Sequence, residues 1–249
     1  MMKGKGKGKG LMRPILMSIL VMMGLVMVLF LAGMVSALTV ISTKVTFFIA
    51  FSLVALIEIV HMFKRRRFDV YGFDIKSMTK AKLLLILPLF LIAIVPLFGG
   101  LESGLSLANI LYIVIYMFIV AFVEEVLYRG IILNNLKQKS VNFAIVGSSV
   151  MFGVSHLITA AGGKDLIDVL YQVVMAITIG LILGLILHYT QNIYLCIGFH
   201  FVNNVIVSIS GSFGDYDMMI SYLILIALLI YLFVLRDKLQ DSKVEETYD

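Results

Sequence analysis

The stretch LANILYIVIYMFIVAFVEEVLYRG, residues 107–130, decides the class of fold to which this protein belongs. It is almost wholly apolar up to Val123, and it then places two adjacent carboxylates, Glu124 and Glu125, before Arg129. A charged side chain inside a hydrocarbon layer is costly unless it is paired or faces a water-filled cavity. The two acids are therefore candidates for a functional site within a membrane helix.

Helix geometry gives the two acids different surroundings. Glu125 and Arg129 are four residues apart and share one helix face, where an ion pair can form. Glu124 points about 100° away from that face and lacks this partner. We therefore interpret Glu125 and Arg129 as structural support, and Glu124 as the residue that carries chemistry.

The composition extends the membrane interpretation to the whole chain. Hydrophobic residues make up 61% of the 249 residues and charged residues 14%, and the mean hydropathy is +1.06, far above that of a soluble domain. The net charge of +5 does not indicate nucleic-acid binding, because the basic residues follow the topology of a membrane protein. The single Cys196 excludes an internal disulfide.

Eight apolar runs are candidates for membrane-spanning helices. They cover residues 15–38, 45–63, 83–98, 107–126, 141–157, 170–187, 193–209 and 218–235. If the N-terminus is cytoplasmic, Lys44 and Lys164 are the only basic residues on the outer side, as the positive-inside rule favours. The sequence therefore predicts an all-α, polytopic membrane bundle of about eight transmembrane helices with both termini in the cytoplasm.

The chain divides into three parts by composition. Residues 1–14 form a basic, Lys/Gly-rich arm whose first ten residues, MMKGKGKGKG, we expect to be disordered at the membrane surface. Residues 15–235 form the membrane-embedded domain, and residues 236–249 form a polar cytoplasmic tail. Since no separate soluble domain is evident, the membrane bundle must house the function.

Further polar residues lie within the predicted spans. The fifth run contains Phe152 and His156 in MFGVSH, and the seventh contains His200 and Asn204 in GFHFVNN. His200 and Asn204 are four residues apart, so they share a helix face. An isolated His or Asn in a membrane helix is more often an interhelical hydrogen-bonding group than a catalyst, but here three helices contribute polar residues.

The depths of these residues in the bundle can be compared from the helical rise. Glu124 lies about 20 Å from Lys137, and His156 lies about 22 Å from the start of its helix at the same face. His200 comes only about 12 Å after Asn192. We therefore expect convergence of the three helices only if the seventh helix is tilted or begins deeper in the bundle.

The combined side chains suit the hydrolysis of a peptide bond. A partly desolvated carboxylate with a neighbouring His can take a proton from water. A second His and an Asn amide can donate hydrogen bonds to the oxyanion that forms when water attacks a carbonyl. Glu124, His156, His200 and Asn204 could supply all of these roles.

Three motifs in this sequence resemble those of the CPBP family of intramembrane endopeptidases, which includes CAAX proteases and bacteriocin-processing enzymes and is also called Abi. EEVLYR at 124–129 resembles Glu-Glu-x-x-x-Arg, FGVSH at 152–156 resembles Phe-x-x-x-His, and HFVNN at 200–204 resembles His-x-x-x-Asn. Each motif alone is weak, but three in the order of the family on membrane spans are specific.

The resemblance implies roles for the site residues. Glu124 and His156 would activate water, and His200 and Asn204 would stabilise the oxyanion. Glu125, Arg129 and Phe152 would support them. The implied partners are a peptide or protein substrate with a membrane-associated segment and the lipid bilayer, and the implied location is a bacterial cytoplasmic membrane.

The residues leave metal dependence open. Two His and one Glu could hold Zn²⁺ with an open position for water. However, the chain lacks the His-Glu-x-x-His spacing that places two ligands on adjacent helical turns, and Asn is a poor zinc ligand. We expect a metal-free glutamate mechanism without a cofactor, with a zinc metalloprotease as the alternative.

Two other classes of protein remain as alternatives to the protease. In a non-catalytic immunity or scaffold protein of this fold, the polar residues would only stabilise the bundle. In a proton-coupled transporter, the acids and His residues would form a relay, and an internal repeat would be expected. No such repeat is evident in the sequence, so we favour the protease.

Overall fold

The computed structural model describes the backbone of residues 7–74 and 79–245, and the side chains of residues 12–74 and 79–238. These ranges form helices, with a single β-bridge between Leu101 and Ser210. The helices are α1 (Lys7–Leu38), α2 (Thr43–Arg65), α3 (Lys80–Ala93), η2 (Val95–Gly99), α4 (Leu107–Glu125), η3 (Val126–Ile132), α5 (Leu133–Leu136), α6 (Val141–Ser155), α7 (Ile158–Ala161), α8 (Leu166–Thr190), α9 (Ile193–Ile209), η4 (Gly214–Tyr216) and α10 (Asp217–Glu245). The segments η2 and η4 are 3₁₀-helices, and η3 is a π-helix.

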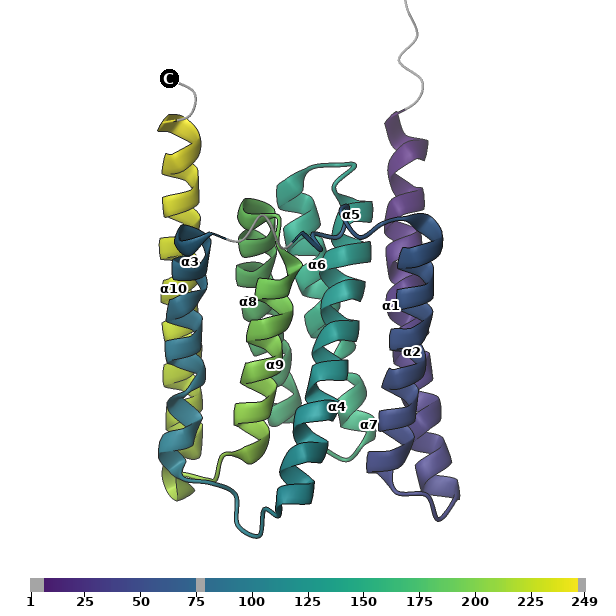
Figure 1. Ribbon diagram of the computed structural model, residues 1–249, viewed down its shortest axis with the longest axis vertical. Coiled ribbons are helices and arrows are strands. Elements are labelled where there is room, and N and C mark those ends of the chain that lie inside the picture. The colour runs from purple at the N-terminus through teal and green to yellow at the C-terminus, as the bar shows by residue number, and fades with distance from the viewer. Residues whose placement is uncertain (1–6, 75–78, 246–249) are drawn as a thin grey trace, which may run out of the picture.

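The predicted spans and the observed helices agree. Among the described residues, seven helical segments are long and apolar enough to cross a membrane, and α9 is a shorter apolar helix. These eight segments correspond to the eight predicted runs, so the prediction of an all-α, multi-pass membrane bundle is confirmed. In Figure 1, α1 begins and α10 ends at the same end of the bundle.

The two chain ends differ in part from the expectation. The helix α1 already begins at Lys7, so the expected disorder of residues 7–10 is wrong, while residues 1–6 lie outside the described part of the chain. Extending a helix that already exists adds a hydrogen bond for each residue without a new nucleation cost. In the same way α10 runs to Glu245, into the predicted polar tail.

Side-chain caps explain where several helices begin. The hydroxyl of Ser106 accepts from the backbone N–H of Asn109 at the start of α4, at 3.2 Å. The hydroxyl of Ser140 accepts from Phe143 N–H at the start of α6, at 3.1 Å. Such caps satisfy backbone donors that have no partner within the helix.

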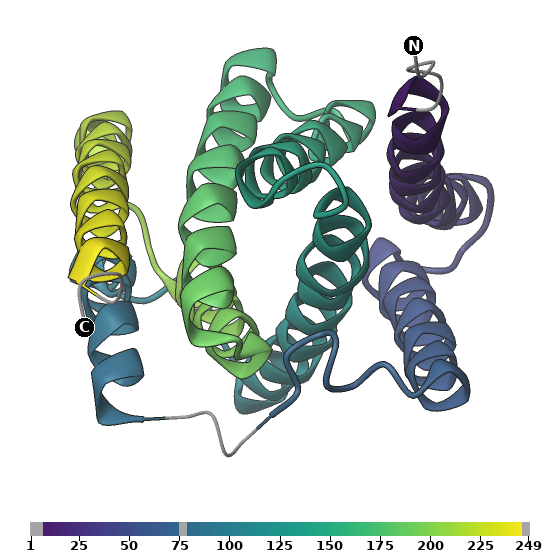
Figure 2. The same ribbon diagram turned by 90° about the horizontal axis from the view of Figure 1, so that it is seen from above.

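The helices form a central group flanked by two pairs. Seen along the bundle in Figure 2, α1 and α2 lie on one side and α3 and α10 on the other, with α4, α6, α8 and α9 between them. Within the central group α6 packs closely on α8, and α4 packs on α9. The three motif-bearing helices α4, α6 and α9 therefore all belong to the centre of the bundle.

Glycines bring α6 and α8 close together. A Cβ atom added at Gly180 would lie 2.9 Å from Cβ of Ser149. A Cβ atom added at Gly153 would lie 2.9 Å from the backbone oxygen of Val173 and closer still to Ile177. Small residues allow such backbone approach between membrane helices.

We expect Gly153→Ala to destabilise the bundle, because the added methyl group must displace the backbone of α8. Overpacking of this kind typically costs about 1–3 kcal/mol. Thermal unfolding in detergent should show a lower midpoint. Gly24→Ala on α1 is the matched control, since nothing lies within 4 Å of a Cβ atom at Gly24; equal midpoints for the two variants would contradict the close α6–α8 contact.

One end of the bundle carries a covering loop. We call this end the basic end, because it holds Lys64, the three arginines that follow it, Lys137 and Lys139. The covering loop, residues 66–74, is held there by backbone and amide contacts to α9 and α5. Gly72 O accepts from Ile193 N–H at 3.0 Å, and Val70 O accepts from the Asn134 amide at 3.2 Å.

Tyr71 anchors the covering loop in an apolar cluster. Its side chain is buried with Met62 and Val126, and Phe68, Phe73 and Phe122 pack around them. Its ring also lies against Gly130 of η3, where an added Cβ atom would be 3.3 Å from the ring. Burial raises the pKa of the Tyr71 phenol, so this side chain stays neutral and the basic end of the bundle core is apolar.

Candidate functional site

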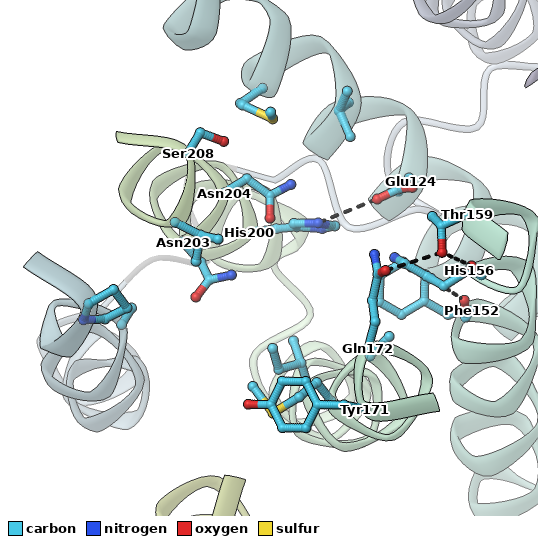
Figure 3. Close-up of a pocket in the computed structure, with 18 of the residues that line it drawn as sticks. Glu124, Phe152, His156, Thr159, Tyr171, Gln172, His200, Asn203, Asn204 and Ser208 are labelled. Atoms are coloured by element: carbon cyan, nitrogen blue, oxygen red, sulfur yellow. Dashed lines mark hydrogen bonds and ion pairs between the residues drawn. The ribbon is translucent and has the colours of Figure 1, made fainter. Parts of the chain in front are cut away.

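A cavity of about 680 Å³ contains all four of the predicted catalytic residues. Figure 3 shows its polar lining, in which Glu124, His156, His200 and Asn204 face the same space from α4, the end of α6 and α9. The cavity extends from the middle of the bundle to Lys164, in the loop after α7, and to Asp217, the first residue of α10, at the end opposite the basic end. The structure therefore brings together residues that are up to 80 positions apart in the chain.

The two acids stand where the regular α-helix ends. The helix α4 ends at Glu125 and continues directly as the π-helix η3, Val126–Ile132. A π-helix is rare and is frequently found at functional sites, because its wider turns change the direction of side chains. The predicted pair still forms: Arg129 Nη1 lies 3.0 Å from Glu125 Oε1, with the two side chains 1% and 0% exposed.

His200 lies between the two acids. Its Nδ1 atom lies 2.7 Å from Glu125 Oε1, and its Nε2 atom lies 3.4 Å from Glu124 Oε2. Glu124 therefore has a partner, which is on α9 and not on its own helix. Glu125 contacts both Arg129 and His200. The spacing within one helix predicted only the contact with Arg129.

The position of α9 explains how His200 reaches the acids. The first residues of α9 lie beneath the covering loop: Asn192 is fully buried and donates its amide N–H to Asp74 O at 2.9 Å. The helix thus begins inside the bundle and not at its surface. The deeper start removes the mismatch between the expected depths of His200 and Glu124.

Phe152 packs among the charged and imidazole groups of the site. Its ring centre lies 4.5 Å from the Arg129 guanidinium carbon, 5.7 Å from the His200 ring centre and 4.9 Å from that of His156. A cation over an aromatic face is stabilised by the ring quadrupole. Phe152 therefore contacts Arg129, His156 and His200 at once.

The hydrogen bond of His156 determines its tautomer. Its Nδ1 atom lies 2.9 Å from the backbone oxygen of Phe152. A carbonyl oxygen only accepts, so Nδ1 carries the hydrogen. In the neutral ring Nε2 is then the basic nitrogen, and the residue lines the same cavity as Glu124.

The cavity also contains polar residues for which no role in catalysis was predicted. They are Ser155, Thr159, Lys164, Tyr171, Gln172, Asn203, Ser208 and Ser221. Gln172 is the clearest omission, because it is a polar residue near the start of an apolar run and could have been noticed there. The others lie at helix ends or beside a motif, where their direction depends on packing.

The acidic and imidazole groups of the site are not arranged as metal ligands. Among the described residues, no group of three or more His, Cys, Asp and Glu side chains is arranged to hold one. His200 is already engaged with both acids, and His156 is bonded through Nδ1 to Phe152. The arrangement therefore does not fit the three-ligand zinc site that Glu124, His156 and His200 might otherwise supply.

Sequence comparison gives an independent view of the same segment. Residues 106–206 match a family model described as Rce1-like, type II CAAX prenyl endopeptidase. This segment contains all three motifs, and the match confirms the family resemblance that they predicted. No curated protein matches the chain.

Proposed function

Residues 106–206 match the Rce1-like CAAX prenyl endopeptidase family model, and from this premise we propose that the protein is an intramembrane endopeptidase that hydrolyses a peptide bond with water activated by Glu124 and His156. The observation that carries the proposal is the cavity in which Glu124 faces His200 at 3.4 Å, with His156 and Asn204 in the same lining. The residues that the motifs single out are thus in one space large enough for a peptide segment.

Charge balance supports a role for His200 as a donor. Glu125 and Arg129 neutralise each other, so an ionised Glu124 needs a further positive charge in its apolar surroundings. The donor role requires a hydrogen on both ring nitrogens of His200, with Nδ1–H toward Glu125 and Nε2–H toward Glu124. The Nε2–H group is then placed to donate to an oxyanion in the cavity.

The first step is the attack of water on the scissile carbonyl carbon. Glu124, with the basic nitrogen of His156 nearby, takes a proton from the water as the new C–O bond forms. The negative charge develops on the carbonyl oxygen. His200 Nε2–H and the Asn204 amide donate hydrogen bonds to this oxyanion.

The second step is the collapse of the tetrahedral intermediate. The C–N bond breaks, and the protonated Glu124 returns its proton to the leaving amine nitrogen. The products are one fragment with a new carboxyl end and one with a new amino end, and both acids regain their starting state. No covalent acyl-enzyme is formed, because water is the nucleophile throughout.

Substrate and location follow the family and the fold. The apolar helices require a bilayer, and we propose that this bilayer is a bacterial cytoplasmic membrane. The substrate is a peptide or protein with a membrane-associated segment, either at a processed C-terminus or within a small secreted precursor. Hydrolysis requires no cofactor in this mechanism. The alternative is a zinc-dependent enzyme, which would require Glu124, His156 and His200 to be arranged differently from the structure described above.

A test of the proposal is the cleavage of a quenched fluorescent peptide panel by the purified protein in detergent, with and without a strong chelator. We expect at least one peptide to be cleaved, and the rate to be unchanged by the chelator. Loss of cleavage that zinc restores would replace the glutamate mechanism with the metal one. Failure to cleave any peptide, with the protein folded, would favour the scaffold alternative.

We expect Asn204→Ala to lower kcat by about 10²–10³-fold, the effect of removing one oxyanion donor. KM should change little, because the hydrogen bond strengthens only as negative charge develops. Steady-state kinetics with a cleaved peptide provide the measurement. Asn109→Ala is the matched control, since Asn109 lies outside the cavity with Glu124 and lines the neighbouring one; a change in KM alone for Asn204→Ala would contradict the oxyanion role.

A further inference from the structure

The two ends of the bundle differ in their access to the site. At the basic end, the covering loop and the apolar cluster around Tyr71 lie over η3 and the start of α9. The cavity lining instead comes from the middle of the helices and from the opposite end. It includes the exposed residues Lys164 after α7 and Asp217 at the start of α10, and the partly buried Phe213 before η4.

The distribution of basic residues relates these ends to the two sides of a membrane. Of the described residues, eight Lys and Arg residues lie in the loops and helix ends at the basic end: Lys64, Arg65, Arg66, Arg67, Lys80, Lys82, Lys137 and Lys139. Short loops rich in Lys and Arg remain in the cytoplasm. The basic end is therefore the cytoplasmic end.

The two basic residues at the other end are associated with cavities. Lys164 lines the cavity that contains Glu124. Lys44 lines a neighbouring cavity of about 570 Å³, which shares Phe47, Tyr116 and Ser208 with the first. Lys residues on the non-cytoplasmic side are disfavoured by the positive-inside rule. A site that opens to this side would explain why these two lysines are found there.

We infer that the cavity opens to the non-cytoplasmic side of the membrane, and that the substrate is a peptide segment that reaches the site from that side. The second half of this inference rests on the proposed function. It selects the secreted or exported precursor from the two substrate classes given above. A C-terminus that remains in the cytoplasm would meet the covering loop and not the mouth of the cavity.

Cysteine labelling tests the sidedness without requiring cleavage. Cys196 is fully buried, so the wild type provides a low background for a membrane-impermeant sulfonated thiol reagent. Three single substitutions report three places: Ser208→Cys in the cavity, Glu102→Cys in an exposed loop at the cavity end, and Lys139→Cys in an exposed loop at the basic end.

In intact bacterial cells whose outer surface is accessible, Ser208→Cys and Glu102→Cys should react, and Lys139→Cys should react only after the cells are opened. Reaction of Lys139→Cys in intact cells would show the opposite orientation and overturn the inference. Reaction of Ser208→Cys only in opened cells, or none even in detergent, would also overturn it, because the cavity would then not be open to the outer side.

Cleavage from one side tests the substrate class separately. A membrane-impermeant quenched peptide that the detergent-solubilised protein cleaves is added to right-side-out and to inside-out vesicles. We expect cleavage by right-side-out vesicles, and by inside-out vesicles only after detergent is added. Labelling from outside combined with cleavage only in inside-out vesicles would reject the assigned substrate side, whereas no cleavage in detergent would reject the proposed hydrolysis and leave the labelling result standing.

A second inference comes from hydrogen bonds at the cavity wall. Gln172 Oε1 lies 2.9 Å from Lys164 Nζ and 3.3 Å from the Thr159 hydroxyl. An ammonium group only donates hydrogen bonds, so the amide oxygen of Gln172 must face it. The NH₂ group is therefore held in the other direction, and Figure 3 shows the Gln172 amide in the cavity beside His156.

Thr159 connects this amide to the candidate base. Its hydroxyl lies 2.7 Å from the backbone oxygen of His156 and also contacts Gln172. The amide and the base are thus held by one short segment of chain. We propose that the Gln172 NH₂ group donates a hydrogen bond to a main-chain carbonyl oxygen of the bound peptide next to the scissile bond, which again rests on the proposed function.

Two substitutions of similar size separate the donor from the structural contacts. Gln172→Glu keeps an oxygen for Lys164 and Thr159 but removes the NH₂ donor, and Gln172→Met removes both. We expect both variants to raise KM by about three- to tenfold, the range of one net hydrogen bond, with kcat little changed. If Gln172 had only a structural role, Gln172→Glu would leave KM unchanged, because it keeps the oxygen that contacts Lys164 and Thr159.

A modified peptide identifies the acceptor. Peptides in which one carbonyl near the scissile bond is replaced by a methylene group are tested as inhibitors of cleavage, and for binding to Glu124→Gln, which should not hydrolyse them. In the protein that keeps Gln172, one of these peptides should bind more weakly than the unmodified peptide. In the protein with Gln172→Glu, that peptide and the unmodified peptide should bind equally. If each modified peptide loses the same affinity in both proteins, the contact with Gln172 is wrong. If the peptides bind but the wild type cleaves none, the proposed hydrolysis alone is rejected.

Discussion

Glu124→Gln is expected to lower kcat by about 10³-fold, the typical contribution of a general base, while the protein remains folded. The substitution keeps the size of the side chain and a possible contact with His200, which lies 3.4 Å away, but an amide cannot accept the proton of the attacking water. Cleavage of a quenched peptide under saturating conditions measures kcat, and thermal unfolding in detergent checks the fold.

Glu102→Gln provides the matched control, because Glu102 is exposed in the loop before α4, away from the cavity lining. It should cleave as the wild type does. Equal kcat for Glu124→Gln and the wild type would show that the catalytic assignment is wrong. A fall in kcat accompanied by a large fall in the unfolding midpoint would instead indicate that Glu124 has a structural role.

Arg129→Met is expected to destabilise the fold by about 3–5 kcal/mol, the cost of leaving a buried charge without its partner. Arg129 is 1% exposed and Glu125 is fully buried, so water cannot replace the lost contact. The guanidinium also lies over the Phe152 ring, and that contact is lost as well. Unfolding in a titration with a denaturing detergent provides the measurement.

The double substitution Arg129→Met with Glu125→Gln distinguishes charge from packing. Removing both charges should recover much of the lost stability, because the remaining amide can still accept from His200 Nδ1. Activity should recover less, since the balance of charge around His200 changes. A double variant as unstable as Arg129→Met alone would show that the packing of Arg129 on Phe152, and not its charge, dominates.

The membrane helices could be predicted from the sequence because their cause is local. A run of apolar residues such as 107–123 buries its own backbone polar groups as a helix, whatever its neighbours are. The start of α1 at Lys7 could not be predicted in this way. Alternating Lys and Gly do not favour a helix, and the order of residues 7–10 depends on the apolar helix that follows them.

The residues of the candidate site could be predicted from the sequence, but the contacts between them could not. The motifs indicated Glu124, His156, His200 and Asn204, and all four line one cavity. The contact of His200 with Glu125 joins residues 75 positions apart, and it depends on where α9 begins beneath the covering loop. The spacing of residues within one helix carries no information on the distance between residues on different helices. For the same reason it could not predict that Gln172 lies beside the site.

The covering loop also has a consequence for the order of events in a catalytic cycle. If the basic end stays closed, substrate and products share one passage, and the fragment lying deepest must wait until the other has left. Release of product, and not bond cleavage, would then limit the rate of turnover. A fragment that binds tightly to the apolar wall would cause product inhibition. Such a chamber favours substrates with few residues beyond the scissile bond, because a longer piece has nowhere to extend.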